Sequence, residues 1–193
     1  MTMSKDFPVP ILDAEDSQYP ENLLSAFEEQ PDDRKWWAVY TKARQEKALA
    51  RQLVQMEVPF YLPLVPKENM IRGRRVKSHI PLFTGYVFVC GDEEQRVKSL
   101  TTNRISTMLP VDDQVQLLTD LRQIAQLIQV DAPLTVEARL TAGDPVRIKN
   151  GPMAGLEGVV ITRRGQARLL VAVKMLQQGV SVEIEDFLLE PLR

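Results

Sequence analysis

From Trp36 to Ile128, apolar and polar positions alternate between the spacing of strands and the spacing of helices. Residues 36–41 predict a strand, and residues 44–56 predict a helix because Leu49 and Leu53 lie one turn apart on the same face. The elements that follow predict an α+β domain: an extended segment at 60–62, a hairpin of 65–70 and 76–82, a strand at 82–90, a helix from Asp92, a strand at 105–109 and a helix from Asp113 to Ile128.

One strand of this domain is apolar on both faces. Its large side chains alternate between the faces, with Phe83, Val87 and Val89 on one and Leu82, Tyr86 and Phe88 on the other. Such a strand needs cover from both sides, because either face would otherwise expose several large apolar groups. We therefore expect it at the centre of an antiparallel sheet that is flanked by helices.

Residues 144–160 predict a second, all-β domain. Val146 and Ile148 alternate with polar residues, which is the spacing of a half-buried strand. The turn at 150–152, Asn-Gly-Pro, combines residues that tolerate positive φ with a fixed proline φ, and a second strand follows at 156–161. The chain has 193 residues, of which 44% are apolar, and this exceeds the needs of one small barrel.

Charge is distributed unevenly along the chain. The whole chain carries −2, but residues 1–33 hold nine Asp and Glu against Lys5, a net charge of −8 that leaves +6 on the rest. Acidic, proline-containing sequence of this kind predicts a disordered tail over 1–33. The basic remainder indicates a body that contacts nucleic acid or an acidic protein surface.

The single cysteine, Cys90, excludes an internal disulfide and fits a reducing compartment. No apolar run approaches the roughly 18 residues of a membrane helix, and the N-terminus lacks the pattern of a signal peptide. We therefore expect a cytoplasmic protein that contacts no membrane, and we expect it to be a monomer.

Three segments resemble the NusG family of transcription elongation factors. The family's KOW motif is similar to DPVRIKNGPMAGLEGVV at 144–160, its first strand to WWAVY at 36–40, and a later strand to PLFTGYVFV at 81–89, where Thr84 replaces the usual proline. The resemblance implies an N-terminal domain of NusG type at 34–130, a linker at 131–142 and a small SH3-like β-barrel at 143–193. In the family member RfaH the KOW domain is stored as a helical hairpin, whereas most of the family keeps a permanent barrel. The glycines and Pro152 of this segment favour the barrel.

The resemblance implies a non-catalytic factor that binds RNA polymerase across the clamp and suppresses pausing or termination. It also implies contact with the non-template DNA strand of the transcription bubble, and recruitment of ribosomal protein NusE or the termination factor Rho through the KOW domain. Residues 99–102, Ser-Leu-Thr-Thr, are similar to a Thr-rich loop of the operon-specific RfaH-like members, whereas the KOW half is ordinary for the family. A general role and an operon-specific role both remain open.

Candidates for the polymerase-binding surface are aromatic residues on strands and two threonines after a helix: Trp37, Phe60, Tyr61, Tyr86, Phe88, Thr101 and Thr102. The group favours a binding surface, because three helices cover only part of both faces of the sheet. At each single position, however, a core residue is the better interpretation. The threonines are equally compatible with an ordinary helix C-terminus.

Candidates for nucleic-acid binding form two sets, Lys42, Arg44, Gln45 and Lys47 near the start of the first helix and Arg72, Arg74 and Arg75 at the hairpin tip. A helix N-terminus favours phosphate, and such contacts are independent of base sequence. We favour binding for Lys42 and Gln45, which match the family's DNA-proximal segment. For the hairpin, a solvated edge strand is an equal alternative.

The KOW partner candidates are Met175 and Leu176, two large apolar residues in a predicted hairpin loop. They replace the aromatic and basic residues usual in the family, so the partner's identity stays open. The alternative is that Met175 folds back onto the barrel.

Two alternative classes of function are a ribosome-associated RNA-binding KOW protein and a metal-dependent enzyme. His79 is the only histidine, and the acids cluster in the tail, where no rigid surroundings would orient them. We therefore expect no catalytic residues, no metal and no cofactor.

Overall fold

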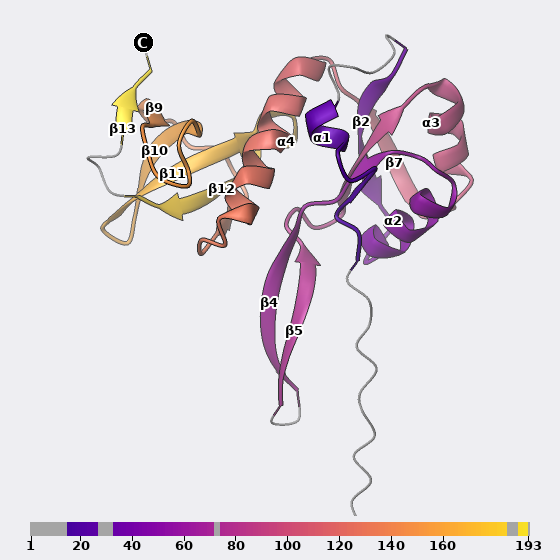
Figure 1. Cartoon of the computed structure of the whole chain (residues 1–193), viewed down its shortest axis with the longest axis horizontal. Coiled ribbons are helices and arrows are strands. Elements are labelled where there is room, and N and C mark those ends of the chain that lie inside the picture. The colour runs from indigo at the N-terminus through magenta and orange to yellow at the C-terminus, as the bar shows by residue number, and fades with distance from the viewer. Residues whose placement is uncertain (1–14, 27–32, 72–73, 185–188, 193) are drawn as a thin grey trace, which may run out of the picture.

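The computed structural model describes residues 15–26, 33–71, 74–184 and 189–192. Two sheet-containing domains lie on opposite sides of one long helix, α4 (Gln114–Gln129), and a two-stranded hairpin extends away from them (Figure 1). No helix in these ranges is long and apolar enough to cross a bilayer.

The N-terminal domain contains a five-stranded antiparallel sheet. Its strands, in spatial order, are β1 (Gln18–Tyr19), β3 (Phe60–Tyr61), β6 (Tyr86–Gly91), β2 (Lys35–Thr41) and β7 (Ile105–Pro110). The strand that is apolar on both faces, β6, lies at the centre of the sheet, as predicted, but it begins at Tyr86 and not at Leu82. Residues 82–85 form the turn before it, so Phe83 does not share a face with Val87 and Val89. The central position of β6 follows from burial, because both β3 and β2 screen it from solvent on its edges.

Helices cover both faces of this sheet. On one face, α2 (Glu46–Gln55) packs Leu49 and Leu53 against Val87 and Val89. On the other face, α4 and the short helix α1 (Leu23–Ala26) pack against a second group, which includes Trp36, Ala38, Tyr61 and Phe88. The sheet therefore lies between two hydrophobic cores.

The predicted helix starts agree with local capping chemistry. Asp92 forms a capping box with Gln95 at the start of α3 (Glu93–Leu100), and the Asp113 carboxylate accepts a hydrogen bond of 2.8 Å from the Gln116 amide at the start of α4. Helix α2 begins at Glu46, two residues after the predicted start. Arg44 has a φ of 59°, a left-handed conformation that a helix cannot include.

The hairpin consists of β4 (Leu64–Ile71) and β5 (Arg74–Pro81), which pair antiparallel along their whole length. The two strands form a sheet of their own and project beyond both domains (Figure 1). The hairpin agrees with the sequence prediction, and its tip at 72–73 lies outside the described residues.

Part of the predicted disordered tail is ordered, which corrects the prediction for 15–26. Strand β1 pairs with the edge strand β3, and Leu23 and Leu24 of α1 are buried against α4. The Arg122 guanidinium donates a hydrogen bond of 2.7 Å to the Leu24 carbonyl. The disorder prediction rested on the acidic composition and gave too little weight to Leu23 and Leu24, whose burial orders this segment. Residues 1–14 and 27–32 lie outside the described residues.

The C-terminal domain is a small antiparallel barrel. Its strands, in spatial order, are β13 (Leu189–Pro191), β9 (Pro145–Ile148), β10 (Glu157–Arg163), β11 (Gln166–Val173), β12 (Gln178–Glu183) and β8 (Thr135–Glu137). Gly151 and Gly155, with φ of 83° and 85°, form the turn between β9 and β10 in the left-handed conformation that glycine tolerates. The barrel form of this domain, predicted in place of a helical hairpin, is confirmed.

Strand β8 corrects the predicted linker, because it lies within residues 131–142 and pairs with β12. A buried arginine explains the pairing. Arg168 on β11 is 6% exposed, and its guanidinium donates to Ser181 Oγ at 2.9 Å and to Thr135 Oγ1 at 3.1 Å. Only residues 130–134 therefore connect α4 to the barrel.

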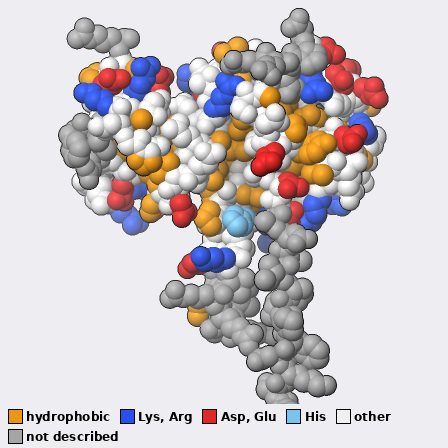
Figure 2. Space-filling model, viewed as in Figure 1, with side chains coloured by type: hydrophobic (Ala, Val, Ile, Leu, Met, Phe, Trp, Pro, Cys, Tyr) orange, Lys and Arg blue, Asp and Glu red, His pale blue; other side chains and the backbone are white. Residues whose placement is uncertain are grey.

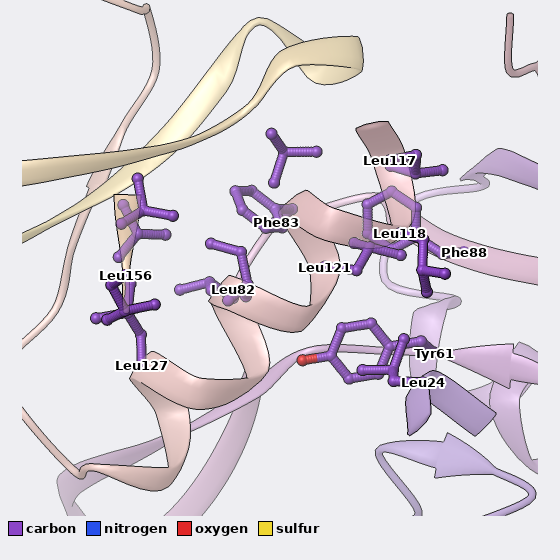
Figure 3. Close-up of a cluster of buried hydrophobic side chains, with 14 of the residues drawn as sticks. Leu24, Tyr61, Leu82, Phe83, Phe88, Leu117, Leu118, Leu121, Leu127 and Leu156 are labelled. Carbon is purple, nitrogen blue, oxygen red and sulfur yellow. The ribbon is translucent and has the colours of Figure 1, made fainter. Parts of the chain in front are cut away.

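The barrel is packed against α4. Leu127 of α4 lies next to Leu156 of the barrel, and Leu82 and Phe83 lie along the same helix (Figure 3). Polar contacts join the same surfaces, because Gln123 Oε1 accepts from the Glu157 amide at 2.6 Å. One hydrophobic core thus continues from the N-terminal sheet across α4 into the barrel.

A buried carboxylate lies in this interface. Asp120 on α4 is 2% exposed, and its Oδ2 accepts a hydrogen bond of 2.9 Å from the Lys174 backbone amide. Burial raises the pKa of Asp120, and the hydrogen bonds from Lys174 and Gln116 oppose that rise. The contact connects α4 directly to the barrel loop that follows β11.

Candidate functional site

Two tyrosines lie side by side at one end of the N-terminal sheet, Tyr40 exposed and Tyr86 half-buried. Tyr40 on β2 faces Tyr86 on β6, with ring centroids 5.2 Å apart and ring planes at 57°. Tyr40 is 44% exposed, whereas Ala38 on the same face of the strand is completely buried. The visible face of this domain carries further hydrophobic side chains (Figure 2). The tyrosine pair therefore offers aromatic surface to a partner.

A tight turn before β6 fixes this pair. Gly85 has a φ of 85°, and its carbonyl accepts a hydrogen bond of 2.8 Å from the Thr41 amide. A Cβ at this position would lie 2.7 Å from Tyr40 Cε2, so the turn packs directly on the Tyr40 ring. Both the backbone conformation and the close contact require glycine here.

Three predicted polymerase-binding aromatics are core residues. Phe60 and Phe88 are completely buried and Tyr61 is 4% exposed. Helix α2 covers Phe60, whereas α1 and α4 cover the other two, with Leu24 against the Tyr61 ring (Figure 3). Burial also raises the pKa of Tyr61. No partner reaches these side chains in this arrangement, because helices cover both faces of the sheet. Trp37 is half-buried on the α2 side.

The two threonines close the C-terminal end of α3. Thr101 Oγ1 donates to the Lys98 carbonyl at 2.7 Å, and Thr102 Oγ1 donates to the Ser99 carbonyl at 2.8 Å. Thr102 is 8% exposed and Thr101 is exposed. This geometry is that of an ordinary helix end, and of the two only Thr101 remains well placed for a partner.

The loop after α3 and the loop before α2 form one surface. The Lys42 ammonium donates to Asn103 Oδ1 at 2.8 Å, and the Lys42 amide donates to the Arg104 carbonyl, also at 2.8 Å. Arg104 in turn contacts Gln45 and donates from Nε to Gln52 Oε1 at 2.7 Å. The structure thus brings the Thr101 loop next to the predicted basic loop.

Among the four predicted ligands of this loop, Lys42 and Arg44 are exposed and Lys47 is half-buried. Gln45 turns toward Arg104, so its amide oxygen is already occupied. Sequence reasoning missed Arg104, because no spacing rule connects residues that are 59 positions apart. The structure therefore retains Lys42 and Arg44 as the solvent-facing cations of the predicted set.

The hairpin candidates are placed only in part. Strand β5 carries Arg74 and Arg75 at its start, at the far end of the hairpin, while Arg72 and the side chains of both arginines lie outside the described residues. Lys77, further along β5, is exposed and lies 3.8 Å from the Glu68 carboxylate. Nucleic-acid binding by the hairpin tip therefore stays a prediction from the sequence.

The predicted KOW partner loop lies against α4. Met175 and Leu176 belong to a 3-10 helix, η2 (Lys174–Leu176), and both are half-buried against the continuous core. The Lys174 ammonium donates to Gln116 Oε1 at 2.9 Å. The partial burial of Met175 agrees with the alternative that this side chain folds back.

No group of three or more His, Cys, Asp or Glu in the described residues is arranged to hold a metal ion. Cys90 is buried, and this burial raises the pKa of its thiol to about 12, so the thiol is protonated at neutral pH. His79 is exposed at the base of the hairpin.

Comparison with known families gives one match that spans more than half of the chain. The model described as transcription termination factor NusG matches residues 34–140. The chain belongs to the NusG family. A curated relative, the transcription termination/antitermination protein NusG of Deinococcus radiodurans, is 29% identical over 181 residues, which covers 78% of this chain and 95% of the relative.

A solved structure is also similar to this NusG family member. The crystal structure of the MjSpt4:Spt5 complex in conformation B covers 81% of this chain and 96% of its own, at 16% identity and a TM-score of 0.26. That score is too low to add to the argument. The family match and the named relative confirm the resemblance and make the chain a transcription termination and antitermination factor.

Proposed function

We propose that this NusG family protein is a non-catalytic elongation factor that binds RNA polymerase across the clamp and suppresses pausing or termination. The observation that carries the proposal is the tyrosine pair of Tyr40 and Tyr86, in which Tyr40 is 44% exposed and Tyr86 is half-buried. Phe60, Tyr61 and Phe88 of the same sheet are buried. Tyrosines are enriched among the residues that dominate binding energy, because they bury a large area at low entropic cost.

The tyrosine pair replaces the larger aromatic surface expected from the sequence. Phe60, Tyr61 and Phe88 contribute to the fold, and their burial gives β2 and β6 the rigidity that holds the pair in place. Thr101 stays in the proposal as a further contact, whereas Trp37 lies on the opposite, α2 side of the sheet from the tyrosine pair. A rigid sheet presents its side chains to a partner with little ordering cost.

The same end of the domain supports contact with the non-template DNA strand. Lys42 directly follows Thr41, the last residue of β2, and Arg44 lies in the loop between β2 and α2. Cations in this position attract phosphate without reading bases. We infer that the tyrosine pair binds the polymerase while Lys42 and Arg44 contact the DNA beside it. We include Lys47 and the hairpin residues Arg72, Arg74 and Arg75 in the proposed DNA-binding surface.

For the barrel, we propose that the loop with Met175 and Leu176 recruits a second protein, for which NusE and Rho are the candidates that the family suggests. In this structure the loop contacts α4 through Lys174. Binding of a partner at the buried parts of Met175 and Leu176 therefore requires the loop to leave α4. Whether the factor acts generally or on few operons is decided by the transcripts it affects.

The test is binding to an elongation complex reconstituted from RNA polymerase on a scaffold with an open bubble. Tyr40→Ala and Tyr86→Ala should each weaken binding by about 2 kcal/mol, the size of a binding hot spot. Val136→Ala on β8 is a matched control, because Val136 is 45% exposed and Tyr40 is 44% exposed. Unchanged affinity in both tyrosine variants would refute the polymerase surface proposed here.

A further inference from the structure

Glu46 is a buried acid that takes no part in the contacts proposed above. It is the first residue of α2 and only 5% exposed. Its Oε1 accepts a hydrogen bond of 2.7 Å from the backbone amide of Gly85, 39 positions away in the sequence. Burying a carboxylate is costly unless it is well paired, so its position calls for a structural or functional reason.

The contact holds the turn that supports the tyrosine pair. The Gly85 amide donates to Glu46 and the Gly85 carbonyl accepts from the Thr41 amide, so α2 and β2 hold the same residue from two sides. Gly85 packs against the Tyr40 ring and directly precedes Tyr86. Any movement of this turn therefore moves both rings.

Glu46 also directly follows the basic loop. The Gln45 amide donates to the Lys42 carbonyl at 3.1 Å, and this closes the loop immediately before α2 begins. The Glu46 carboxylate therefore connects two segments. One is the start of α2 with the loop of residues 42–45 before it, and the other is the Gly85 turn next to the tyrosine pair. The negative charge at the first helical position is itself favourable near the helix N-terminus.

We propose that Glu46 is a positioning residue that fixes the tyrosine pair and the basic loop as a single rigid surface. It touches neither polymerase nor DNA. Its carboxylate sets the distance between the aromatic contact and the phosphate contact, so that both are made at once. The inference rests on the proposed function, since it names the residue that aligns the two halves of that surface.

The chemistry predicts how substitutions at this position differ. Glu46→Gln keeps an acceptor oxygen at the same reach and retains the position of the turn, although a neutral acceptor binds more weakly. Glu46→Ala leaves the Gly85 amide without its acceptor. Glu46→Asp keeps the charge but shortens the side chain by one methylene, which draws the acceptor away from Gly85.

The experiment is a double-mutant cycle on the full-length protein with the reconstituted elongation complex. We expect Glu46→Ala to weaken binding by about tenfold or more and Glu46→Gln to restore most of that loss. In a Tyr86→Ala background, Glu46→Ala should cost less than it does in the wild type, because one of the rings that it positions is gone. The salt dependence of binding should become gentler in Glu46→Ala, because the basic loop is no longer held in the position from which it meets phosphate. Glu94→Ala, at an exposed acid on α3, is the control.

Each outcome decides between distinct conclusions. If Tyr86→Ala binds like the wild type, the proposed polymerase surface is wrong. The inference about Glu46 is wrong if Tyr86→Ala weakens binding but Glu46→Ala does not. It is also wrong if Glu46→Ala weakens binding as much in the Tyr86→Ala background as in the wild type. Should Glu46→Ala lose its cooperative melt, Glu46→Asp takes its place in the cycle with the same expectation. The Gly85 amide proton resonance reports directly on the hydrogen bond to Glu46, and it should move upfield in Glu46→Ala and in Glu46→Asp.

Discussion

Aromatic residues on the N-terminal sheet divide into those that build the core and those that remain on the surface. Phe88 has no exposed surface and Tyr40, on the neighbouring strand, is 44% exposed. Residue type and strand position alone do not separate them, because both lie in strands of alternating apolar residues. The cover provided by α1 and α4 makes the difference.

Phe88→Ala should therefore destabilise the protein by about 3–5 kcal/mol, because it leaves a cavity between the sheet and α4. Tyr40→Ala should cost much less, since solvent already reaches that ring. Denaturant unfolding of both variants measures the two values. Similar small losses for both would mean that Phe88 is accessible and that the original assignment of this side chain to a binding surface was right.

The basic loop shows which part of the site could be predicted from the sequence. Lys42 and Arg44 were predicted and are exposed. Arg104, Glu46 and the uncovered face of Tyr40 were not predicted as site residues, because their roles depend on contacts between distant segments. Local patterns predict which residues can bind, whereas tertiary packing decides which of them face solvent.

Replacing both Lys42 and Arg44 by alanine should reduce the salt dependence of binding to the elongation complex. The slope of log K against log salt should fall by about one unit per lost phosphate contact. Lys149→Ala, at an exposed cation of the barrel, is the control and should leave the slope unchanged. An unaltered slope in the double variant would remove this loop from the DNA contact.

At the scale of elements, long periodic segments were predicted well and short ones were not. The central strand β6, helix α4 and the strands of the KOW segment follow from apolar spacing and turn residues. Strand β8 and helix α1 were not predicted, because each is too short to show a clear apolar spacing and each is held in place by residues distant in the sequence. For β8 that partner is Arg168, 33 positions from Thr135.

Arg168→Ala should therefore release β8 and destabilise the barrel by roughly 2–3 kcal/mol, the cost of lost hydrogen bonds to a buried charged group. Amide hydrogen exchange should become faster at 135–137 before it changes elsewhere in the barrel. Arg139→Ala, an exposed arginine just after β8, should have no such effect. Protection that survives in Arg168→Ala would show that backbone pairing alone holds the strand.

At the scale of the whole molecule, α4 is shared by both domains. Its leucines belong to one core that reaches from Trp36 to the barrel residue Val171. With only residues 130–134 between α4 and β8, the barrel has little length of chain with which to move away. The loop with Met175 and Leu176 is therefore held against the N-terminal domain unless the contacts with α4 break.

Asp120 gives a direct measure of this docking in solution. Its pKa is raised above the ordinary value of 3.8 by burial, so protonation favours the docked state. This contribution is fully present below the ordinary Asp pKa and is lost as pH rises through the raised value. Asp113 on α4 also raises the pKa, and Lys174 on the barrel lowers it. Docking should thus strengthen on mild acidification.

The amide of Lys174, bound to Asp120 Oδ2 at 2.9 Å, is the natural reporter. In the full-length protein its NMR shift should titrate with a midpoint above 3.8, and Asp120→Asn should abolish that titration while keeping an acceptor at the same place. If the Lys174 amide follows an ordinary Asp titration, Asp120 is solvated, and the barrel does not rest on α4 in solution. A raised midpoint that disappears in Asp120→Asn would instead show that the loop after β11 is docked on α4 in solution.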